Sequence, residues 1–302
     1  MSVLQTSTLD LPLDQAAKLI TQVKTTSTVA ALSAREPKRF GRDEQYIKFT
    51  GKPRAQFVEE GAAKASSNPT VTTVQSATHT VQVTMRTSNQ VRWADEDYQL
   101  GVFAELAALG AEAMARALDL GVYHRINPIT GTPITTWTNW LGETTNRVPV
   151  PATGAKHDEL IEAAAGILIG LGTVPDGVAL TPDVAFSIAT QRDQIGHLLY
   201  PELGFGVGIS SFKGLRASSS TTVSGLPEAT ADTGMRAIVG DFAGGILWGV
   251  ARDFPIEVIE YGDPDNSGFD LKNKNEIALR LEMVYSWYVL PERFAIVGVP
   301  GE

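Results

Sequence analysis

The 302-residue chain is 43% hydrophobic and 20% charged, has a formal net charge of −9, and contains no cysteine. This length and apolar content allow a sizeable core and two domains, which argues against global disorder. The lack of cysteine excludes a disulfide framework and thiolate metal sites, and no apolar run approaches the ~20 residues of a membrane span. We therefore expect a soluble cytoplasmic product without a membrane segment.

The charge is unevenly distributed along the chain. Residues 1–56 contain nine Lys or Arg and five Asp or Glu, a net charge of +4, which leaves −13 for the remainder. The acidic remainder disfavours sequence-specific nucleic-acid binding, which needs a basic face. A basic arm on an acidic body suits attraction between subunits at least as well as contact with phosphate, and both interpretations stay open.

The first 42 residues lack a compact hydrophobic pattern. They begin without the basic and apolar segments that define a signal peptide. One weakly amphipathic helix is compatible with the sequence between Asp14 and Leu32, and residues 35–42 are open and polar. An extended arm is expected here.

An extended hairpin is predicted over residues 43–92. Its tip, residues 57–70, is rich in Gly, Ala and Ser, which offer little surface to bury, and Pro69 disfavours a continuous central strand. From Thr78 to Trp93 apolar and polar residues alternate, which predicts a sixteen-residue strand on the order of 50 Å long. The apolar positions are Val81, Val83, Met85, Val91 and Trp93. Such a hairpin cannot bury both faces alone, so copies of the chain should cover it; the alternative is the edge hairpin of a large sandwich.

A long helix is predicted from about Leu100 to Tyr123. Asp95 and Asp97 offer N-capping oxygens and negative charge for the positive end of the helix dipole, and Gly121 precedes the predicted end. The helix has an apolar stripe that predicts ordinary core packing, so it is expected to be scaffold. The stripe consists of Phe103, Leu106, Leu109, Ala113, Met114, Ala117 and Leu120.

The remaining elements are shorter, apart from one further long strand. Residues 135–155 are predicted to be irregular and 196–234 to be rich in loops. Between and after them we expect helices at 157–171 and from Pro182, and strands at 177–181, 237–241, 245–248 and 256–261. Residues 277–290 alternate with apolar odd positions, and a short apolar strand, 291–297, closes the chain.

This order of elements resembles the major capsid proteins of tailed phages, whose fold is named after phage Hong Kong 97. The hairpin tip, the long helix and the final long strand are the features that carry the resemblance, which covers roughly residues 30–300. It implies an α+β fold divided into an N-arm (1–42), an E-loop hairpin (43–92), a first part of the P-domain with the spine helix (93–155), an A-domain (156–255), and the return strands of the P-domain (256–302).

The resemblance implies a major capsid protein of a tailed double-stranded-DNA phage or prophage. Such a protein self-assembles as pentamers and hexamers into an icosahedral shell in the host bacterial cytoplasm, and the shell encloses the genome without sequence-specific binding. Its partners would be other copies of itself, a portal, a decoration protein and a separate scaffold protein. In many relatives a long N-terminal scaffolding segment is removed; here the resemblance starts too early for one, so the particle should retain the first residues. The alternatives are an encapsulin-type compartment shell and a hydrolase with a long dimerisation hairpin.

The residues expected to contact neighbouring subunits lie in the hairpin tip and the arm. They are Phe57, Glu59, Lys64 and Asn68 in the tip, and Arg39 and Arg42 in the arm. No enzyme is expected, because the sequence has neither a G-x-S-x-G nucleophile elbow nor a phosphate-binding P-loop. The four histidines lack the spacing of a metal site, so no cofactor or metal is expected.

In some members of the family an isopeptide bond joins neighbouring subunits. The resemblance matches Lys64 to the attacking lysine, Asn275 to the asparagine and Glu282 to the carboxylate base. The lysine must first lose its proton, although its reference pKa is about 10.4. The alanines around Lys64 desolvate an ammonium poorly, so we expect interdigitated but non-covalent packing.

Overall fold

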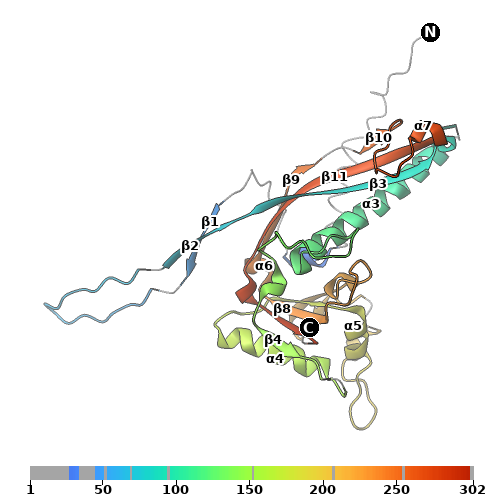
Figure 1. Ribbon diagram of the computed structural model, residues 1–302. Coiled ribbons are helices and arrows are strands. Elements are labelled where there is room, and N and C mark those ends of the chain that lie inside the picture. Colours follow the sequence, from blue (N-terminus) through green and yellow to red (C-terminus); the bar gives the residue numbers. More distant parts are fainter. Residues whose placement is uncertain are drawn as a thin grey trace.

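The computed structural model describes the segments 27–33, 45–50, 53–68, 70–93, 96–151, 153–205, 208–253 and 256–299. These segments form two sheets, a long helix and a projecting hairpin, which together give an elongated molecule (Figure 1). Among the helices in these segments, none is both long and apolar enough to cross a membrane.

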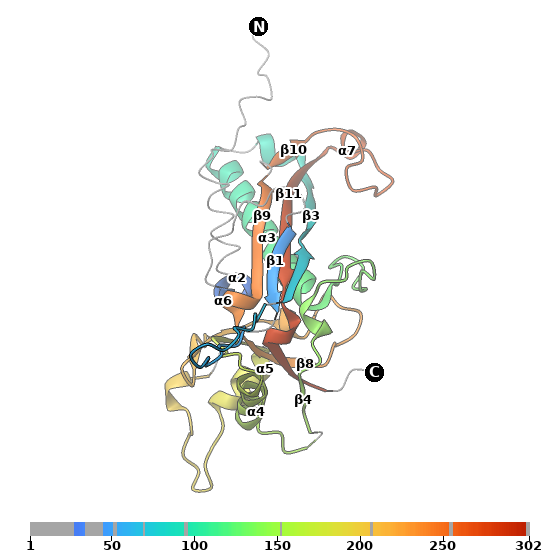
Figure 2. The ribbon, with the colours of Figure 1, turned by 90° about the vertical axis from the view of Figure 1, so that its left-hand side faces the viewer.

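The longest strand, β11 (Glu276–Val289), organises the first sheet. It pairs antiparallel with β3 (Ala77–Ser88) from Glu276 opposite Ser88 to Trp287 opposite Ala77. Its other edge pairs with β10 (Glu257–Ile259) and β9 (Ile246–Asp253), and Figure 2 shows β9, β11 and β3 running side by side. All odd positions of β11 from 277 to 289 are buried, which confirms the apolar face predicted from the alternation.

The strand predicted over residues 78–93 ends early, at Ser88. Residues Asn89–Trp93 form a 3-10 helix instead. The reason lies in the partner strand: Asn275, just before β11, has a left-handed backbone (φ 57°), so no extended partner continues past Ser88. The Gln90 amide also donates to Ser88 Oγ at 3.2 Å, a local bond that competes with the ladder. The paired strand is therefore roughly 40 Å long rather than 50 Å.

The predicted spine helix is α3 (Glu96–His124), and it packs closely against β11. Gly121 lies inside the helix rather than marking its end. A Cβ at Gly121 would lie 2.8 Å from Trp287 Cη2, so glycine is needed for this close approach. Leu109, assigned to the apolar stripe, is 51% exposed, whereas Leu118 and Val122 are fully buried. The proposed cap Asp95 lies outside the described residues.

The second sheet has six strands and its own helical layer. The strand order is β4 (Arg147–Pro149), β12 (Phe294–Gly298), β8 (Met235–Gly240), β5 (Gly177–Leu180), β7 (Leu215–Ser219) and β6 (Ser211–Phe212). Helices α4 (His157–Gly170) and α5 (Pro182–Ala189) pack on one face, through side chains such as Ile161 and Ile188. The sequence predicted the bounds of α4 and β5 to within one residue and the start of α5 at Pro182.

The two sheets do not divide where the predicted domain boundaries fall. Strand β9, within the predicted A-domain, pairs with β11 of the first sheet. Strands β4 and β12, on either side of that range in the sequence, complete the second sheet. Residues 135–155, predicted to be irregular, therefore contribute β4 as an edge strand parallel to β12. Such non-local pairings leave no local sequence signal.

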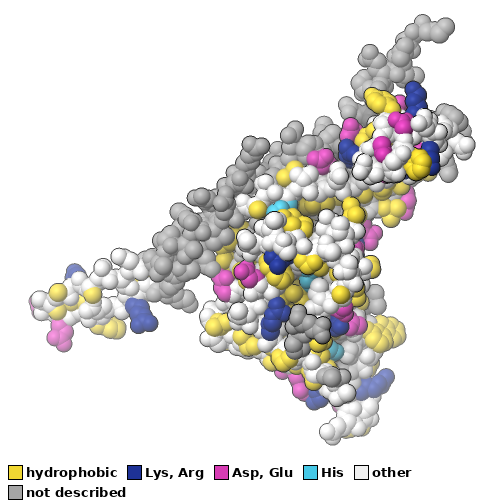
Figure 3. Space-filling view, in the orientation of Figure 1, with side chains coloured by type: hydrophobic (Ala, Val, Ile, Leu, Met, Phe, Trp, Pro, Cys, Tyr) yellow, Lys and Arg dark blue, Asp and Glu magenta, His cyan; other side chains and the backbone are white. Residues whose placement is uncertain are grey.

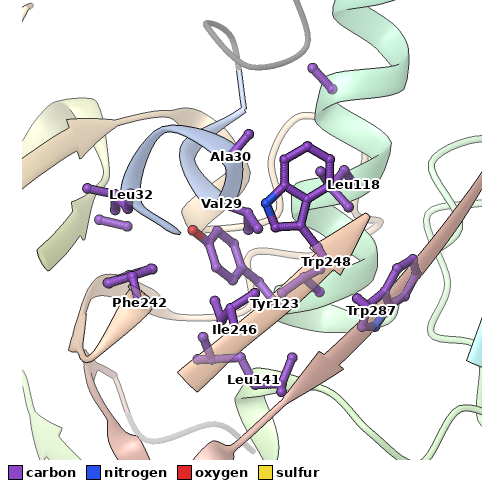
Figure 4. Close-up of a cluster of buried hydrophobic side chains, with 14 of the residues drawn as sticks. Val29, Ala30, Leu32, Leu118, Tyr123, Leu141, Phe242, Ile246, Trp248 and Trp287 are labelled. Atoms are coloured by element: carbon purple, nitrogen blue, oxygen red, sulfur yellow. The ribbon is translucent and has the colours of Figure 1, made fainter. Parts of the chain in front are cut away.

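One buried cluster joins the two sheets, the spine helix and a short N-terminal helix, α2 (Thr28–Ser33). Figure 4 shows Val29 and Leu32 of α2 gathered with Tyr123, Phe242 and Trp248. The Trp248 indole Nε1 donates to Ser33 Oγ at 2.9 Å, which satisfies its buried N–H. α2 thus belongs to the core of the body, although it lies in the segment predicted to be an arm.

Candidate assembly surfaces and their anchors

The hairpin loop, residues 53–68, is exposed throughout. Its base is a short antiparallel ladder between β1 (Gln45–Thr50) and β2 (Thr70–Gln75). Every residue of the hairpin loop is exposed, and the side chain of Phe57 is 105% exposed. The loop projects away from the two sheets (Figure 1). Within its own chain, the hairpin loop therefore has no buried core: Phe57 is fully exposed and Val58 only partly covered.

A few hydrogen bonds across the hairpin loop hold its two sides together. The Arg54 amide donates to Ser67 Oγ at 2.8 Å, and the Ala65 amide donates to Gln56 Oε1 at 3.2 Å. The Ala62 amide donates to the Glu59 carbonyl at 3.1 Å, where Gly61 adopts φ +83°. These local bonds shape the loop without a core, so its outer side chains remain free to contact another molecule.

The structure places the predicted contact residues as follows. Phe57, Glu59, Lys64 and Asn68 all lie in the hairpin loop and are exposed. Arg39 and Arg42 lie outside the described residues. The tip residues thus share one projecting surface, and their role in contacts stays a prediction.

The three crosslink candidates do not meet within one chain. Lys64 lies in the hairpin loop, whereas Asn275 follows α7 (Leu271–Lys274) at the opposite end of the long sheet (Figure 1). Asn275 Oδ1 accepts from Asn89 Nδ2 at 3.4 Å, and its carbonyl accepts from the Asn89 amide at 2.9 Å. Glu282 faces Gln82 in the ladder with β3. A bond between Lys64 and Asn275 would have to join different subunits.

A buried carboxylate on the spine helix anchors the N-terminal helix. Asp119 is fully buried, and both of its oxygens accept hydrogen bonds from α2 and the residue before it. Oδ2 accepts from the Thr28 amide at 3.0 Å, and Oδ1 accepts from the Val29 amide at 3.1 Å. Further donors are the hydroxyls of Ser27, Thr28 and Thr222. Burial raises the pKa of Asp119 above its usual value, because desolvation outweighs these hydrogen bonds.

One turn further along the spine helix, His124 binds the segment that contains Thr222, which also donates to Asp119. Its Nε2 lies 3.0 Å from the Thr222 carbonyl and 3.1 Å from the Val223 carbonyl, so Nε2 carries the hydrogen and donates it. Burial lowers the pKa of His124 to about 4. Asp119 and His124 together fix residues 222–223 against the spine helix.

We expect the stability of the subunit to fall as the pH drops from 6.5 to 4. A histidine whose pKa is lowered on folding makes its full contribution to the stability of the folded state above its unfolded pKa, near 6.5. That contribution is lost as the pH falls towards the folded pKa of about 4. For His124 the loss is about 3 kcal/mol. Urea unfolding at pH 7 and pH 4 measures it, and His124→Gln should lose less than the wild type over the same interval.

The comparison with His124→Gln is needed because a second histidine titrates in the same range. Burial lowers the pKa of His79 to about 4; its ring lies 3.8 Å from the ring of Trp137 and 4.2 Å from that of Trp287. The difference between the wild type and His124→Gln isolates His124. Equal losses in both proteins would contradict the assignment.

An ionic cluster that the sequence analysis missed lies at the far end of the long sheet. Arg86 of β3 is bound there by Asp263, Asp265 and Glu276. The spacing Asp263-x-Asp265-x-Ser267-Gly268 is visible in the sequence and could have drawn attention to this loop. Among the described residues, no group of three or more His, Asp or Glu is arranged to hold a metal ion.

No protein-family model and no curated protein matches the sequence, but solved phage capsid structures do. A chain in the structure of Mycobacterium phage Ogopogo is 41% identical, and the match covers 99% of this chain and 100% of that one with a TM-score of 0.81. The chain belongs to the tailed-phage major capsid proteins with the Hong Kong 97 fold. The family resemblance and the α+β fold predicted from the sequence are confirmed.

Two further solved structures are similar to this capsid protein. A chain of Gordonia phage Cozz is 28% identical with a TM-score of 0.76, covering 92% of this chain and 87% of that one. A chain from the capsid of a native GTA particle, computed with C5 symmetry, is 12% identical with a TM-score of 0.57. That match covers 86% of both chains and shows the shared fold alone.

As a major capsid protein, the chain has a structural role: it assembles with copies of itself into the icosahedral shell of the virion. The encapsulin-type alternative is not favoured, because the matching structures are capsids.

Proposed function

We propose that this capsid protein holds neighbouring subunits through its hairpin loop, residues 53–68. The observation that supports the proposal is the full exposure of Phe57 on a loop that has no core of its own. Burying a phenylalanine side chain contributes about 1.5–3 kcal/mol, and aromatic side chains are frequent anchors of interfaces. Repeated in every subunit, such individually modest contacts add up over the shell.

The charged residues around Phe57 add orientation to that contact. Arg54 and Lys64 are positive, Glu59 and Glu60 are negative, and all four are exposed. Charges at the rim of an interface mainly set the register and the rate of association. Arg39 and Arg42, in the segment proposed as the N-arm, supply further positive charge for the acidic body of a neighbour.

The packing between subunits is proposed to be non-covalent. Lys64 lies on an exposed loop whose small neighbours cannot form the apolar pocket that the crosslinking reaction needs. The Asn275 amide is already engaged by Asn89, and Glu282 faces the polar side chain of Gln82. Lys64 is therefore expected to contact a carboxylate or carbonyl of the next subunit.

The shell as a whole is proposed to consist of pentamers and hexamers and to enclose double-stranded DNA. The net charge of −9 favours containment without sequence-specific binding. Assembly would take place in the host cytoplasm with a separate scaffold protein, and a portal and a decoration protein would join the shell. The proposed domains are an N-arm (1–42), an E-loop (43–92), a first part of the P-domain (93–155), an A-domain (156–255) and the return strands of the P-domain (256–302).

A photo-crosslinking residue at position 57 tests the contact and its non-covalent nature together. We replace Phe57 by p-benzoyl-phenylalanine in the full chain, assemble shells, illuminate them, and run denaturing gels. Before illumination the shells should give a single band at the subunit mass of 32.4 kDa. After illumination a band at twice that mass should appear, because the probe lies against a neighbour. The same probe at Phe242, which is fully buried in its own subunit, is the matched control and should give no dimer.

Two results would refute parts of this proposal separately. Illuminated shells without any dimer band would show that Phe57 does not contact a neighbour. A ladder of bands before illumination that disappears in Lys64→Ala would show that the subunits are covalently joined through Lys64.

A further inference from the structure

The loop between β10 and β11 is tied to a distant strand by one arginine. Arg86 lies on β3, and the loop follows some 175 residues later in the sequence. The Arg86 guanidinium nevertheless contacts Asp263 and Asp265 of the loop and Glu276 at the start of β11. The Arg86 side chain is only 17% exposed, and the three acidic side chains are 27–31% exposed. Acidic and basic side chains lie side by side at this end of the molecule (Figure 3).

The oxygens of this loop converge on a single nitrogen. Arg86 Nη2 lies 2.6 Å from Asp263 Oδ1, 2.5 Å from Ser267 Oγ and 3.2 Å from the Phe269 carbonyl, and it also contacts Asp265 Oδ1. One guanidinium nitrogen has only two hydrogens to donate. A spherical hard cation such as Ca²⁺ gathers about six to eight oxygens, and the four oxygens of three chemical types around Nη2 form part of such a ligand set.

The sequence spacing of these oxygens has the same pattern. Calcium loops of the EF-hand type use positions 1, 3 and 5 through side chains and position 7 through its carbonyl, with glycine at position 6. With Asp263 as position 1, positions 3, 5 and 7 are Asp265, Ser267 and Phe269, and position 6 is Gly268. Gly268 has φ +84°, and its amide donates to Asp263 Oδ2 at 2.7 Å, which closes the turn.

We infer that residues 263–269 form a calcium-type binding loop in which the guanidinium of Arg86 stands in the place of the metal. The loop is therefore ordered by a cation that belongs to the fold, and its order does not depend on divalent ions.

The departure from a full calcium loop supports the same assignment. Position 12, which supplies a bidentate glutamate in EF-hands, is Lys274, and its Nζ lies 3.9 Å from the centre of the Phe269 ring. The third carboxylate comes instead from Glu276, whose Oε2 accepts from Arg86 Nη1 at 3.3 Å. Without Arg86, the remaining oxygens would bind calcium weakly, with a dissociation constant on the order of 10⁻⁴–10⁻³ M.

The test is to remove the internal cation and offer calcium in its place. Arg86→Met in the full chain keeps the length of the side chain but not its charge. We expect amide hydrogen exchange over residues 262–275 to accelerate by at least about tenfold, because the loop loses its central partner. Calcium chloride in roughly tenfold excess over the expected dissociation constant should restore the protection, by binding the folded loop. The wild type should show no response to calcium.

Two further variants separate a vacated cation site from a simple loss of loop contacts. Arg280→Met removes a neighbouring arginine that donates to the Pro264 carbonyl at 2.6 Å and to Thr84 Oγ1 at 3.3 Å. Any loss of protection in that variant should not respond to calcium. Adding Asp265→Asn to Arg86→Met should abolish the calcium response.

Three outcomes would overturn the inference. Arg86→Met could keep the protection of the wild type, it could lose protection that calcium does not restore, or the wild type could itself respond to calcium. The first would show that Arg86 does not order the loop, the second that the loop is not a cation site, and the third that Arg86 does not occupy it.

Discussion

Alanine in place of Asp119 is expected to destabilise the folded subunit by about 2–6 kcal/mol. Asp119 is fully buried, and its two oxygens accept from the amides of Thr28 and Val29. Alanine leaves both amides without a partner, and each buried unsatisfied donor costs about 1–3 kcal/mol. The hydroxyls of Ser27 and Thr222 can turn towards other acceptors, so we count only the two amides.

Urea unfolding of unassembled subunits measures this loss, and limited proteolysis near α2 shows whether the helix detaches. Asn is not a conservative replacement: whichever oxygen becomes NH₂ then faces one backbone N–H, so Asp119→Asn should also destabilise. Glu112, which is exposed on the same helix, provides the control, and Glu112→Ala should stay within about 0.5 kcal/mol of the wild type. An Asp119→Ala protein as stable as this control would disprove the anchor.

Deleting residues 60–69 is expected to abolish shell closure while the subunits still fold. The deletion removes most of the hairpin loop, which makes no core contacts, and leaves residues 51–59 to connect the paired Thr50 and Thr70. That connection is longer than the two to five residues of common hairpin loops, so the ladder between β1 and β2 can form. What is lost is the outer part of the loop, with Lys64 and Asn68. Phe57 and Glu59 remain in the sequence but are drawn back towards the ladder, away from the place where we propose that they meet a neighbour.

Negative-stain microscopy and sedimentation distinguish closed shells from small oligomers in this experiment. A second variant, in which Gly and Ser replace the same residues at equal length, separates the reach of the loop from its side chains. If that variant assembles and the deletion does not, the reach of the loop is what matters. Closed shells of normal size from the deletion would remove the hairpin loop from the assembly mechanism.

The sequence predicted those elements whose pattern is local. Alternation was enough for β11, because one of its faces is buried along its whole length. Pro182 at a helix start and the apolar period of α4 placed both helices of the second sheet. The exposed hairpin tip was also predictable, since its small residues offer little to bury.

The features that could not be predicted depend on partners far away in the sequence. The early end of β3 is set by the backbone at Asn275, and Asp119 binds residues some 90 positions earlier. The place of α2 in the core depends on Trp248 and Phe242, which no local pattern connects to it. Similarly, the spacing of Asp263 and Asp265 is visible in the sequence, but nothing local indicates that the cation is Arg86.

The two ladders carry mechanical load differently. A pull along the long axis of the first sheet acts parallel to β11 and β3, so all twelve residue pairs from Glu276–Ser88 to Trp287–Ala77 are sheared together. Only Pro291–Arg293 and the adjoining Leu290 separate β11 from β12, and this short connection passes tension into the centre of the second sheet. A pull on the hairpin loop along its own axis draws β1 and β2 in the same direction, so it leaves their six pairs unsheared. Ser76 alone separates β2 from β3, and tension applied to the hairpin within a shell would therefore pass directly into the twelve-pair ladder.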